Sequence, residues 1–518
     1  MPNPNLFNTR HDITKNEAGG IAFKMSPEHA LAQYAVTGTL YNTYYVDDKN
    51  QLEHLLELLK KVSPEFVAKT AIYARQEGYM KDVPAALCAW LAANDISLLK
   101  KVFFRVIDNP VMLRKFVQFV RSGVFGRKSF GYAPKKLINQ YLTNSSFEVL
   151  FKGSIGKNPS LADVIKMTHP KPKDKTQEVF FRYICGYDDI NLDDLPQVVQ
   201  EYEVFKKNLP TDIPKNVDFR FLTALPLTKD HWKKIALTAP WHMTRMNLNT
   251  FKRYGVLDDP EIVSVIAERL QNEELIRKNK VFPYQLFITY MSIPRGEMPK
   301  EIIEALKRAV LISMNNVPDF DPDLQIAICP DVSGSMNSPI AANRQGIARY
   351  IDVASIFTAA IKAKTNNYII LPFNHDLMEL SDIEEDDVFT LASKIRKMCN
   401  GGTNCSLPMD FLVSKYYTGK PDIIIYISDN ESWIDTDNIY RENTETNKLW
   451  KQYKQKRNPN AKLICWDIAP YKTVQVKDEP DVLNIGGFSD RIMDIIYLFI
   501  NNKLEGKYWK EVIDSIDL

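Results

Sequence analysis

The sequence predicts a multidomain protein, with an array of short helices over residues 1–320 and a doubly wound α/β domain over residues 321–518. Two observations predict this organisation. The chain has 518 residues, more than one hydrophobic core usually serves. Its pattern also changes after the Pro- and Asp-rich loop at 317–323, from amphipathic runs to short apolar runs that alternate with helical stretches.

The first part consists of short runs with apolar residues three and four apart, the spacing of a helix with one buried face. Ser63 and Pro64 mark one boundary, because serine caps a helix and proline suits its first position. No such run can bury its apolar face alone, so we expect stacked helical pairs in a degenerate repeat array. The expected helices are 52–62, 65–79, 83–93, 98–107, 111–120, 134–142, 161–167, 231–237, 260–270, 284–291 and 299–312.

The second part alternates buried strands with helices. Apolar runs of four to six residues between helical stretches are typical of a parallel sheet covered on both faces. Ligands bind such sheets at the carboxyl ends of the strands. The expected strands are 324–329, 368–371, 423–427 and 463–468. The expected helices are 347–363, 387–398, 407–417 and a last one from 485 to 500.

The composition is that of a folded, soluble protein, with 45% hydrophobic and 25% charged residues. No apolar run reaches the roughly 18 residues that span a bilayer, and the polar N-terminus does not resemble a signal peptide. Six cysteines are scattered without C-x-x-C spacing, which favours isolated, reduced thiols. We therefore expect a cytoplasmic protein without a membrane partner.

A metal site is predicted at the strand ends. Asp331, Ser333 and Ser335 follow the first strand at alternate positions, so a tight loop can direct three oxygens to one point. Thr403 lies in a glycine-rich loop, and Asp429 follows another buried strand. Oxygen ligands suit a hard divalent cation, first Mg²⁺, with Mn²⁺ or Ca²⁺ as alternatives. The alternative is that the D-x-S-x-S sequence forms a turn that binds no metal, since a motif this short often occurs by chance.

A basic segment is the second feature. Residues 101–175 hold 15 Lys and Arg but only four Asp and Glu, although the whole chain has a net charge of +2. Charge segregated in this way can attract a polyanion.

The strand-end motif resembles the metal-ion-dependent adhesion site of von Willebrand factor A domains, which reads D-x-S-x-S, then T, then D. The resemblance implies direct metal contact from Ser333, Ser335 and Thr403, with Asp331 and Asp429 acting partly through water. It also implies an open metal position that a carboxylate of a partner fills. A site of this kind binds and does not catalyse.

The whole chain resembles Ro autoantigen-type proteins, which combine a TROVE module with such an A domain. The similar segments of the A domain are GGTNCSLPM (401–409), SDNES (428–432) and GFSD (487–490). Those of the first part are NEAGG (16–20), Gly38-Thr39 with Tyr44-Tyr45, GVFGR (123–127), IKMTHPKP (165–172) and FPYQL (282–286). They occur in the family's order over nearly the full length.

This resemblance implies a monomeric ring of HEAT-like helical repeats that the A domain closes. Single-stranded 3′ ends of misfolded RNAs would enter its basic hole, and small structured Y RNA-like molecules would bind its outer surface. A 3′ exoribonuclease or another RNA-processing protein is an implied partner. The implied role is non-catalytic, in RNA quality control and processing.

The basic segment coincides with the RNA-binding region of the family. The candidate RNA-binding residues are Arg121, Arg127, Lys128, Lys135, Lys136, Lys152, Lys157, Lys166, His169, Lys171 and Lys173. Cations presented in this way neutralise phosphates without reading sequence. Phe125, Phe130 and Tyr132 lie between them and could stack on unpaired bases. The alternatives are a solvated helix face for the lysines, a structural role for His169 and core positions for the aromatic residues.

Three classes of function remain open. An RNA-binding ring is the leading one. A protein-adhesion module that captures an acidic residue at the metal is the second, and it is compatible with the first. A metal-dependent nuclease or phosphatase is the third. It is disfavoured because the sequence shows neither a carboxylate cluster for two metals nor a Ser/His/Asp arrangement.

Overall fold

The computed structural model describes residues 13–16, 20–37, 48–279, 281–294, 296–340, 348–381, 383, 386–429, 444–469, 473–477, 479–487, 492–502 and 508–518. The chain forms two compact units. The helical unit comprises Ser63–Leu270, Ile293–Ile303 and Ile516–Leu518. The mixed unit comprises Met1–Val62, Gln271–Ser292 and Glu304–Ser515. The beginning of the chain therefore packs with its C-terminal part.

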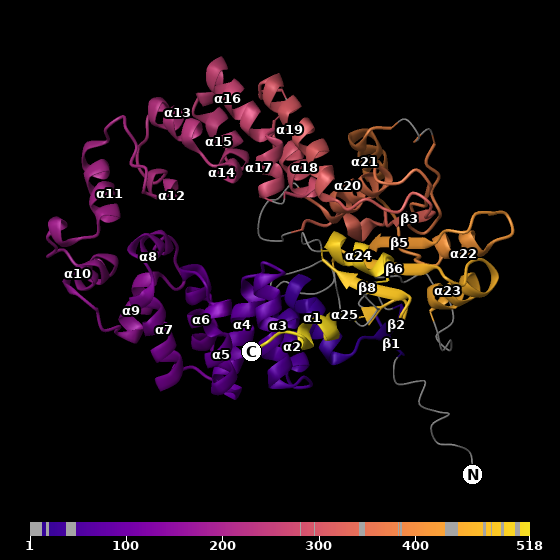
Figure 1. Ribbon diagram of the computed structural model, residues 1–518, viewed down its shortest axis with the longest axis horizontal. Helices are drawn as coiled ribbons and strands as arrows, with labels where there is room; N and C mark the ends of the chain where they lie inside the picture. The colour runs from indigo at the N-terminus through magenta and orange to yellow at the C-terminus, as the bar shows by residue number, and fades with distance from the viewer. Residues whose placement is uncertain are drawn as a thin grey trace, which may run out of the picture. The chain divides into compact units, whose positions relative to one another are not determined.

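The helical unit consists of short helices joined by short loops (Figure 1). They are α3 (Pro64–Gln76), α4 (Asp82–Asn94), α5 (Ile96–Val106), α6 (Pro110–Ser122), α7 (Tyr132–Asn144), α8 (Phe147–Gly153), α9 (Leu161–Thr168), α10 (Lys175–Ile184), α11 (Gln197–Asn208), α12 (Phe219–Leu222), α13 (Lys229–Thr238), α14 (Trp241–Met246), α15 (Leu248–Arg253) and α16 (Pro260–Leu270).

Local sequence explains where these helices begin and end. Ser63 caps α3, and its hydroxyl accepts a hydrogen bond from the backbone N–H of Phe66 at 3.2 Å. Asn109 caps α6 in the same way, and a proline follows each of these caps at the first helical position. Gly123 ends α6 with φ of +78°, a left-handed conformation that glycine adopts without strain. The capping signals of the sequence are therefore used as expected.

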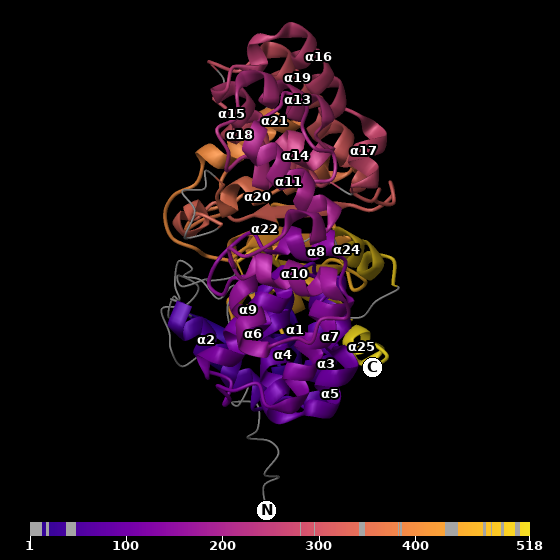
Figure 2. The ribbon, with the colours of Figure 1, turned by 90° about the vertical axis from the view of Figure 1, so that its left-hand side faces the viewer.

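Neighbouring helices of the helical unit stack on one another. Helix α4 packs against α3, α5 and α6, and Figure 2 shows this group from a second side. Phe103 of α5 and Phe116 of α6 meet edge to face, with ring centroids 5.3 Å apart. Later in the chain α13 packs against α16. Each helix buries its apolar face against its neighbours, so the expected stacking is confirmed.

The mixed unit contains a five-stranded parallel sheet in the order β4-β3-β5-β6-β8. Its strands are β3 (Ile326–Pro330), β4 (Tyr368–Ile370), β5 (Ile423–Ser428), β6 (Lys462–Asp467) and β8 (Val482–Gly486). The helices that follow these strands are α20 (Tyr350–Lys362), α21 (Val388–Lys397), α22 (Leu407–Val413), α23 (Glu445–Lys456) and α24 (Ile492–Ile500). The predicted doubly wound α/β domain is confirmed.

Helices cover both faces of this sheet. On one face, Cys465 of β6 belongs to the core that also contains Met409 of α22 and Trp450 of α23. On the other face, Trp466 packs on Phe357 of α20, with ring centroids 4.5 Å apart. Consecutive strand residues point to opposite faces, so both faces of β6 are buried. This double burial explains why the strands read as continuous apolar runs.

A second, smaller sheet joins distant parts of the sequence. Strands β1 (Ile13–Lys15) and β2 (Ile21–Lys24) form a hairpin, and β2 pairs antiparallel with β7 (Thr473–Val474). Helix α1 (Pro27–Thr37) then packs against β8 and α25. The remaining helices are α2 (Asp48–Leu59), α17 (Glu273–Lys278), α18 (Pro283–Ser292), α19 (Lys300–Ser313) and α25 (Tyr508–Asp514).

The structure corrects one expected element and shortens another. The expected helix from 485 to 500 is wrong over its first residues, because β8 runs to Gly486 and α24 begins only at Ile492. The expected helix 407–417 ends at Val413. The first error arises because a short apolar run does not by itself distinguish a strand from a helix. The second arises because Tyr416 and Tyr417 follow the helix and extend the apparent pattern. Among the described residues, no helix is both long enough and apolar enough to cross a membrane.

Candidate metal centre and nucleic-acid interface

The D-x-S-x-S loop begins where β3 ends. The backbone N–H of Asp331 donates to the carbonyl of Ile427 in β5 at 2.9 Å, so Asp331 is still held in the sheet. Its Oδ1 accepts a hydrogen bond from the N–H of Ser333 at 2.7 Å. The hydroxyl oxygens of Ser333 and Ser335 lie 3.1 Å apart. All three side chains are buried, so the loop gathers three oxygen-bearing groups at the carboxyl end of β3.

Strand β5 supplies the second carboxylate. Ser428 is its last residue, and its hydroxyl donates to Asp331 Oδ2 at 2.6 Å. Asp429 follows and is also buried. Because β3 and β5 are neighbouring parallel strands, their carboxyl ends lie at one edge of the sheet. The structure therefore brings Asp331 and Asp429 together, as the sequence predicts.

The glycine-rich loop lies against this edge. The N–H of Gly334 donates to the carbonyl of Gly401 at 2.9 Å. Gly401 has φ of +75°, and a Cβ at this position would collide with the ring of His375. Thr403 is buried two residues further on. All three predicted segments thus meet, and we call Asp331, Ser333, Ser335, Thr403 and Asp429 the strand-end site.

The strand-end site concentrates negative charge. Burial, followed by the neighbouring charge of Asp429, raises the pKa of Asp331 to about 7. Burial and the charges of Asp429 and Asp467 raise the pKa of Tyr350 to about 12. A divalent cation would neutralise this charge. The described residues contain no group of three or more His, Cys, Asp or Glu side chains that could hold a metal, so the hydroxyls would have to complete the donor set.

This donor set fits a hard cation. The two carboxylates would supply charge, and the hydroxyls of Ser333, Ser335 and Thr403 would supply neutral oxygens. All five side chains are buried, so their positions are fixed before any ligand binds. Metal binding and the identity of the metal stay predictions.

The candidate RNA-binding residues all lie in the helical unit, mostly at its surface. The exposed ones are Arg121, Lys128, Lys136, Lys152, Lys157, Lys166, His169, Lys171 and Lys173. Arg127 and Lys135 are half-buried. His169 ends α9 in a left-handed conformation, with φ of +49°. Its N–H donates to the carbonyl of Ile165 at 2.9 Å, so its backbone has a structural role while its side chain is exposed.

Some of these cations already have partners within the protein. Arg127 donates to the carbonyls of Ser129 and Ala92, each at 2.6 Å. Lys152 forms an ion pair with Asp218 at 3.2 Å, and Lys173 donates to a side-chain amide at 2.7 Å. Arg127 therefore fastens the loop before α7 to α4, which is a structural task.

Other cations have no such partner. Within the described part of the chain, no carboxylate lies within ion-pair distance of Lys128, Lys136, Lys157, Lys166 or Lys171. These exposed ammonium groups are available to a polyanion from solution. RNA contact by the individual residues stays a prediction.

The structure decides between the alternatives for the aromatic residues. Phe125 and Phe130 are buried, and Phe125 packs edge to face on Phe119 with ring centroids 5.9 Å apart. They belong to the core and are not available for base stacking. Tyr132, at the start of α7, is 81% exposed. Of these three residues, only Tyr132 is accessible for stacking on a base.

Comparisons with known proteins agree with both parts of the molecule. The family model described as the Ro60 vWA domain matches residues 325–500. The RNA-binding protein RO60 of Deinococcus radiodurans is 21% identical over 526 residues, which cover 95% of this chain and 96% of that protein. The crystal structure of the Deinococcus radiodurans RO (RSR) protein has the same fold, with a TM-score of 0.63 at 17% identity. It covers 92% of this chain and 100% of the other. Residues 325–500 therefore match a Ro60 vWA domain, and the chain is similar to Ro proteins over nearly its full length.

The Ro resemblance can be placed on the structure only in part. The segments GVFGR, IKMTHPKP, FPYQL and GGTNCSLPM lie in the described helices and loops. Residues 17–19, 38–45, 430–432 and 488–490 lie outside the described residues, and they include parts of the other motifs.

Several residues of the strand-end site escaped the sequence analysis. Ser428 holds Asp331 in place, and Asp467 lies opposite Ser428 in the pairing of β5 with β6. Asp467 is buried, and its Oδ1 accepts from the N–H of Ala469 at 3.1 Å. The thiol of Cys399 donates to the carbonyl of Ser333 at 3.1 Å. Ser428 and Asp467 could have been found from the rule that ligands bind at the carboxyl ends of parallel strands. Nothing in the sequence points to Cys399.

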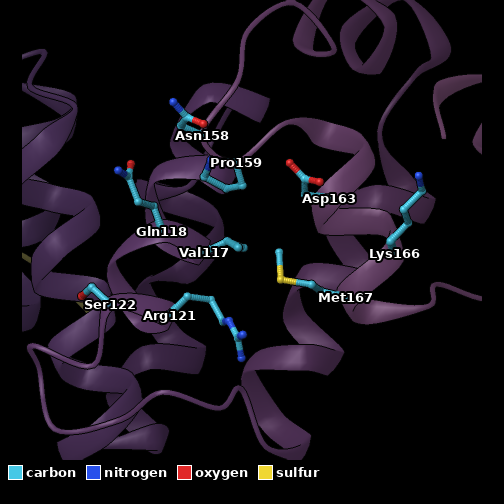
Figure 3. Close-up of a pocket in the computed structure, with 9 residues that line it drawn as sticks. All are labelled: Val117, Gln118, Arg121, Ser122, Asn158, Pro159, Asp163, Lys166 and Met167. Atoms are coloured by element: carbon cyan, nitrogen blue, oxygen red, sulfur yellow. The ribbon is translucent and has the colours of Figure 1, made fainter. Parts of the chain in front are cut away.

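The helical unit also contains a pocket, shown in Figure 3. It has a volume of about 630 Å³ and lies between α6, the loop before α9, and α9 itself. Two predicted residues, Arg121 and Lys166, line it together. The sequence analysis missed Gln118 and Asn158, which also line it, because single amides in a helix and a loop carry no signal.

Proposed function

We propose that this protein binds small structured non-coding RNA through the basic segment, residues 101–175, without cleaving it. The main observation that supports this proposal is a group of exposed lysines in the helical unit. Within the described residues, these lysines have no carboxylate partner. Exposed cations of this kind bind phosphates and carry affinity without sequence preference. The similarity over nearly the full length to a relative named as an RNA-binding protein supports the same function.

We further propose that its ligands are Y RNA-like molecules and the single-stranded 3′ ends of misfolded RNAs. The proposed role is RNA quality control and processing in the cytoplasm, with a 3′ exoribonuclease or another RNA-processing protein as partner. The family resemblance of the sequence supports these statements. Ring closure and the monomeric state, which the same resemblance implies, stay predictions.

The deciding experiment is a gel-shift titration with two RNAs that differ only in a single-stranded 3′ extension, at several salt concentrations. A protein with about six phosphate contacts loses roughly a thousandfold in affinity between about 50 and 200 mM salt. We expect a steep salt dependence and tighter binding of the extended RNA. The RNA should remain intact in a nuclease-free preparation.

A matched pair of variants ties the binding to the basic segment. One variant changes Lys136, Lys166 and Lys171 to Gln. The control changes Lys420, Lys448 and Lys456, exposed lysines of the mixed unit, to Gln, so both variants lose three charges. Only the first should flatten the salt dependence. Equal effects of the two triple variants would show that net charge, and not the basic segment, determines binding.

A second function is favoured by the strand-end site. We propose that it holds a divalent cation that presents an open position to a carboxylate of a protein partner. The buried, convergent oxygen groups support this proposal. Calorimetric titration with Mg²⁺, Mn²⁺ and Ca²⁺ tests it, with Asp331→Asn as the variant that lacks one charge. Loss of metal binding with unchanged RNA affinity would show that the two functions are separate.

A further inference from the structure

The pocket between α6 and α9 has two kinds of surface. Met167 and Pro159 are half-buried and, with the buried Val117 beneath them, form an apolar floor. The side chains of Val117 and Met167 approach the same space from opposite sides (Figure 3). Gln118 and Asn158 also line the pocket, but their amides point away from the space between Val117 and Met167 (Figure 3). The pocket therefore has an apolar floor with polar side chains at its rim.

Cations stand at the rim of the same pocket. Arg121 lies in the last turn of α6 and is exposed, and it donates a long hydrogen bond, 3.3 Å, to the carbonyl of Lys128. Lys166 on α9 is exposed, and within the described residues no carboxylate lies within ion-pair distance of it. Two positive groups therefore flank an apolar floor, an arrangement that suits a ligand with a flat apolar part and a negative part.

The one acid of the pocket is already engaged. The carboxylate of Asp163 accepts hydrogen bonds from the N–H of Ser160 at 2.8 Å and from its hydroxyl at 2.7 Å. These bonds form the capping box of α9 and hold the pKa of Asp163 below its usual value. The acid is thus fixed by the helix start, and among the described residues it forms no direct ion pair with either rim cation, although the charge of Lys166 also lowers its pKa. The charge that remains open to a ligand is positive.

We propose that this pocket holds one unpaired nucleotide, with its base on the floor of Met167 and Pro159 and its two flanking phosphates near Arg121 on one side and Lys166 on the other. A base is flat and carries edge donors and acceptors, and the exposed side chains of Gln118 and Asn158 would turn inward to meet them. The volume, about 630 Å³, leaves room for a single nucleotide with its sugar. This inference rests on the proposed RNA binding, and it adds a site that recognises an unpaired position within a structured RNA.

The test fills the pocket without disturbing the core. Gln118 is exposed at the rim of the pocket, and Gln118→Trp would place an indole over the floor. Gln140 is an exposed glutamine of α7 that does not line the pocket, so Gln140→Trp is the matched control. Circular dichroism and thermal unfolding establish that both variants fold like the parent protein.

The probes are two hairpin RNAs, one fully paired and one with a single unpaired 2-aminopurine, together with adenosine 5′-monophosphate. We expect the protein to bind the hairpin with the unpaired base about tenfold more tightly than the fully paired hairpin. Binding should also change the fluorescence of the 2-aminopurine. Gln118→Trp should abolish both effects, whereas Gln140→Trp should retain them. Lys166→Gln should lower the salt slope by about one, compared with Lys420→Gln, an exposed lysine of the mixed unit outside the basic segment, as the control.

The outcomes separate this inference from the proposed function. Equal binding of both hairpins, unaffected by Gln118→Trp, would overturn the pocket assignment while RNA binding stands. Binding of adenosine monophosphate alone, lost in Gln118→Trp, would support a nucleotide pocket that serves a free nucleotide, and it would overturn RNA binding. No binding of any probe would overturn both.

Discussion

The strand-end site and the basic segment place charge in opposite ways. In the strand-end site, two carboxylates are buried, and short hydrogen bonds from Ser333 and Ser428 fix one of them. In the basic segment, most cations stand on long exposed side chains, and only a few, such as Lys152, have a partner within the protein. The side chains of the first region are held by contacts within the protein, whereas most cations of the second extend into solvent.

Because of this difference, we expect substitutions to have different effects in the two regions. Replacing one buried group of the strand-end site changes the charge balance among its fixed partners, so we expect it to abolish the proposed metal binding even where the fold is retained. An exposed lysine of the basic segment would contribute only one of several similar phosphate contacts. We therefore expect large, localised effects in the strand-end site and small, additive ones in the basic segment.

The largest expected effect is the loss of metal-dependent stabilisation in Asp331→Asn. At about one hundred times the dissociation constant, a bound metal stabilises the folded parent protein by about 2.7 kcal/mol. The variant keeps the shape of the side chain but lacks the charge, so added Mg²⁺ should no longer raise its unfolding temperature. Thermal unfolding with and without metal measures this.

The metal-free state supplies the control for that comparison. Burial and the charge of Asp429 disfavour ionised Asp331 and raise its pKa to about 7. At pH 8 without metal, Asp331→Asn should therefore unfold at the same temperature as the parent protein or above it. A variant that unfolds much earlier in chelator would show that Asp331 serves the fold more than the metal.

The strand-end site was largely predictable because its position follows from topology. Parallel strands bring their carboxyl ends to one edge, so Asp331 and Asp429 could be paired although they are far apart in sequence. Cys399 could not be found in this way, because its contact with the Ser333 carbonyl depends on how a loop folds back. The basic segment was predictable only as a segment, since charge counts do not reveal which cations have partners.

The second prediction breaks the comparison, because it concerns a cation of the basic segment that behaves like a buried group. Arg127 donates to the carbonyls of Ala92 and Ser129. Arg127→Gln should lower the free energy of unfolding by about 2 kcal/mol, as expected for lost charge-assisted hydrogen bonds. Urea unfolding measures the change, and Lys128→Gln, its exposed neighbour, is the control. If the Arg127→Gln variant is stable and its RNA binding depends less on salt, Arg127 contacts RNA and has no major role in stability.

The third prediction concerns the loop that carries Thr403. Gly401 has φ of +75°, and a Cβ would meet the ring of His375. Gly401→Ala should cost about 1 kcal/mol in the free energy of unfolding and weaken metal binding, because the loop must shift. Gly296→Ala is the matched control, since nothing lies within 4 Å of a Cβ there and its φ is not positive. Unchanged metal affinity in Gly401→Ala would mean that the loop does not position Thr403.

The fold shows the same division between local and distant information. Helices α3 to α7 were predicted nearly to their ends, because periodicity and capping residues are local signals. Strand β8 was mistaken for the start of a helix, because a short apolar run does not by itself distinguish a strand from a helix. The pairing of β2 with β7 joins residues about 450 positions apart, and no local sequence pattern predicts it.

The smallest expected effect sharpens the comparison within the basic segment itself. Lys136→Gln and Lys152→Gln remove the same charge from exposed side chains, but Lys152 pairs with Asp218 at 3.2 Å. Each should change the free energy of unfolding by less than about 0.5 kcal/mol, as is usual at an exposed surface. Lys136→Gln should lower the salt slope of RNA binding by about one. Lys152→Gln should lower it less, because its ammonium group is already partly neutralised, and equal slopes would show that RNA displaces Asp218 from Lys152.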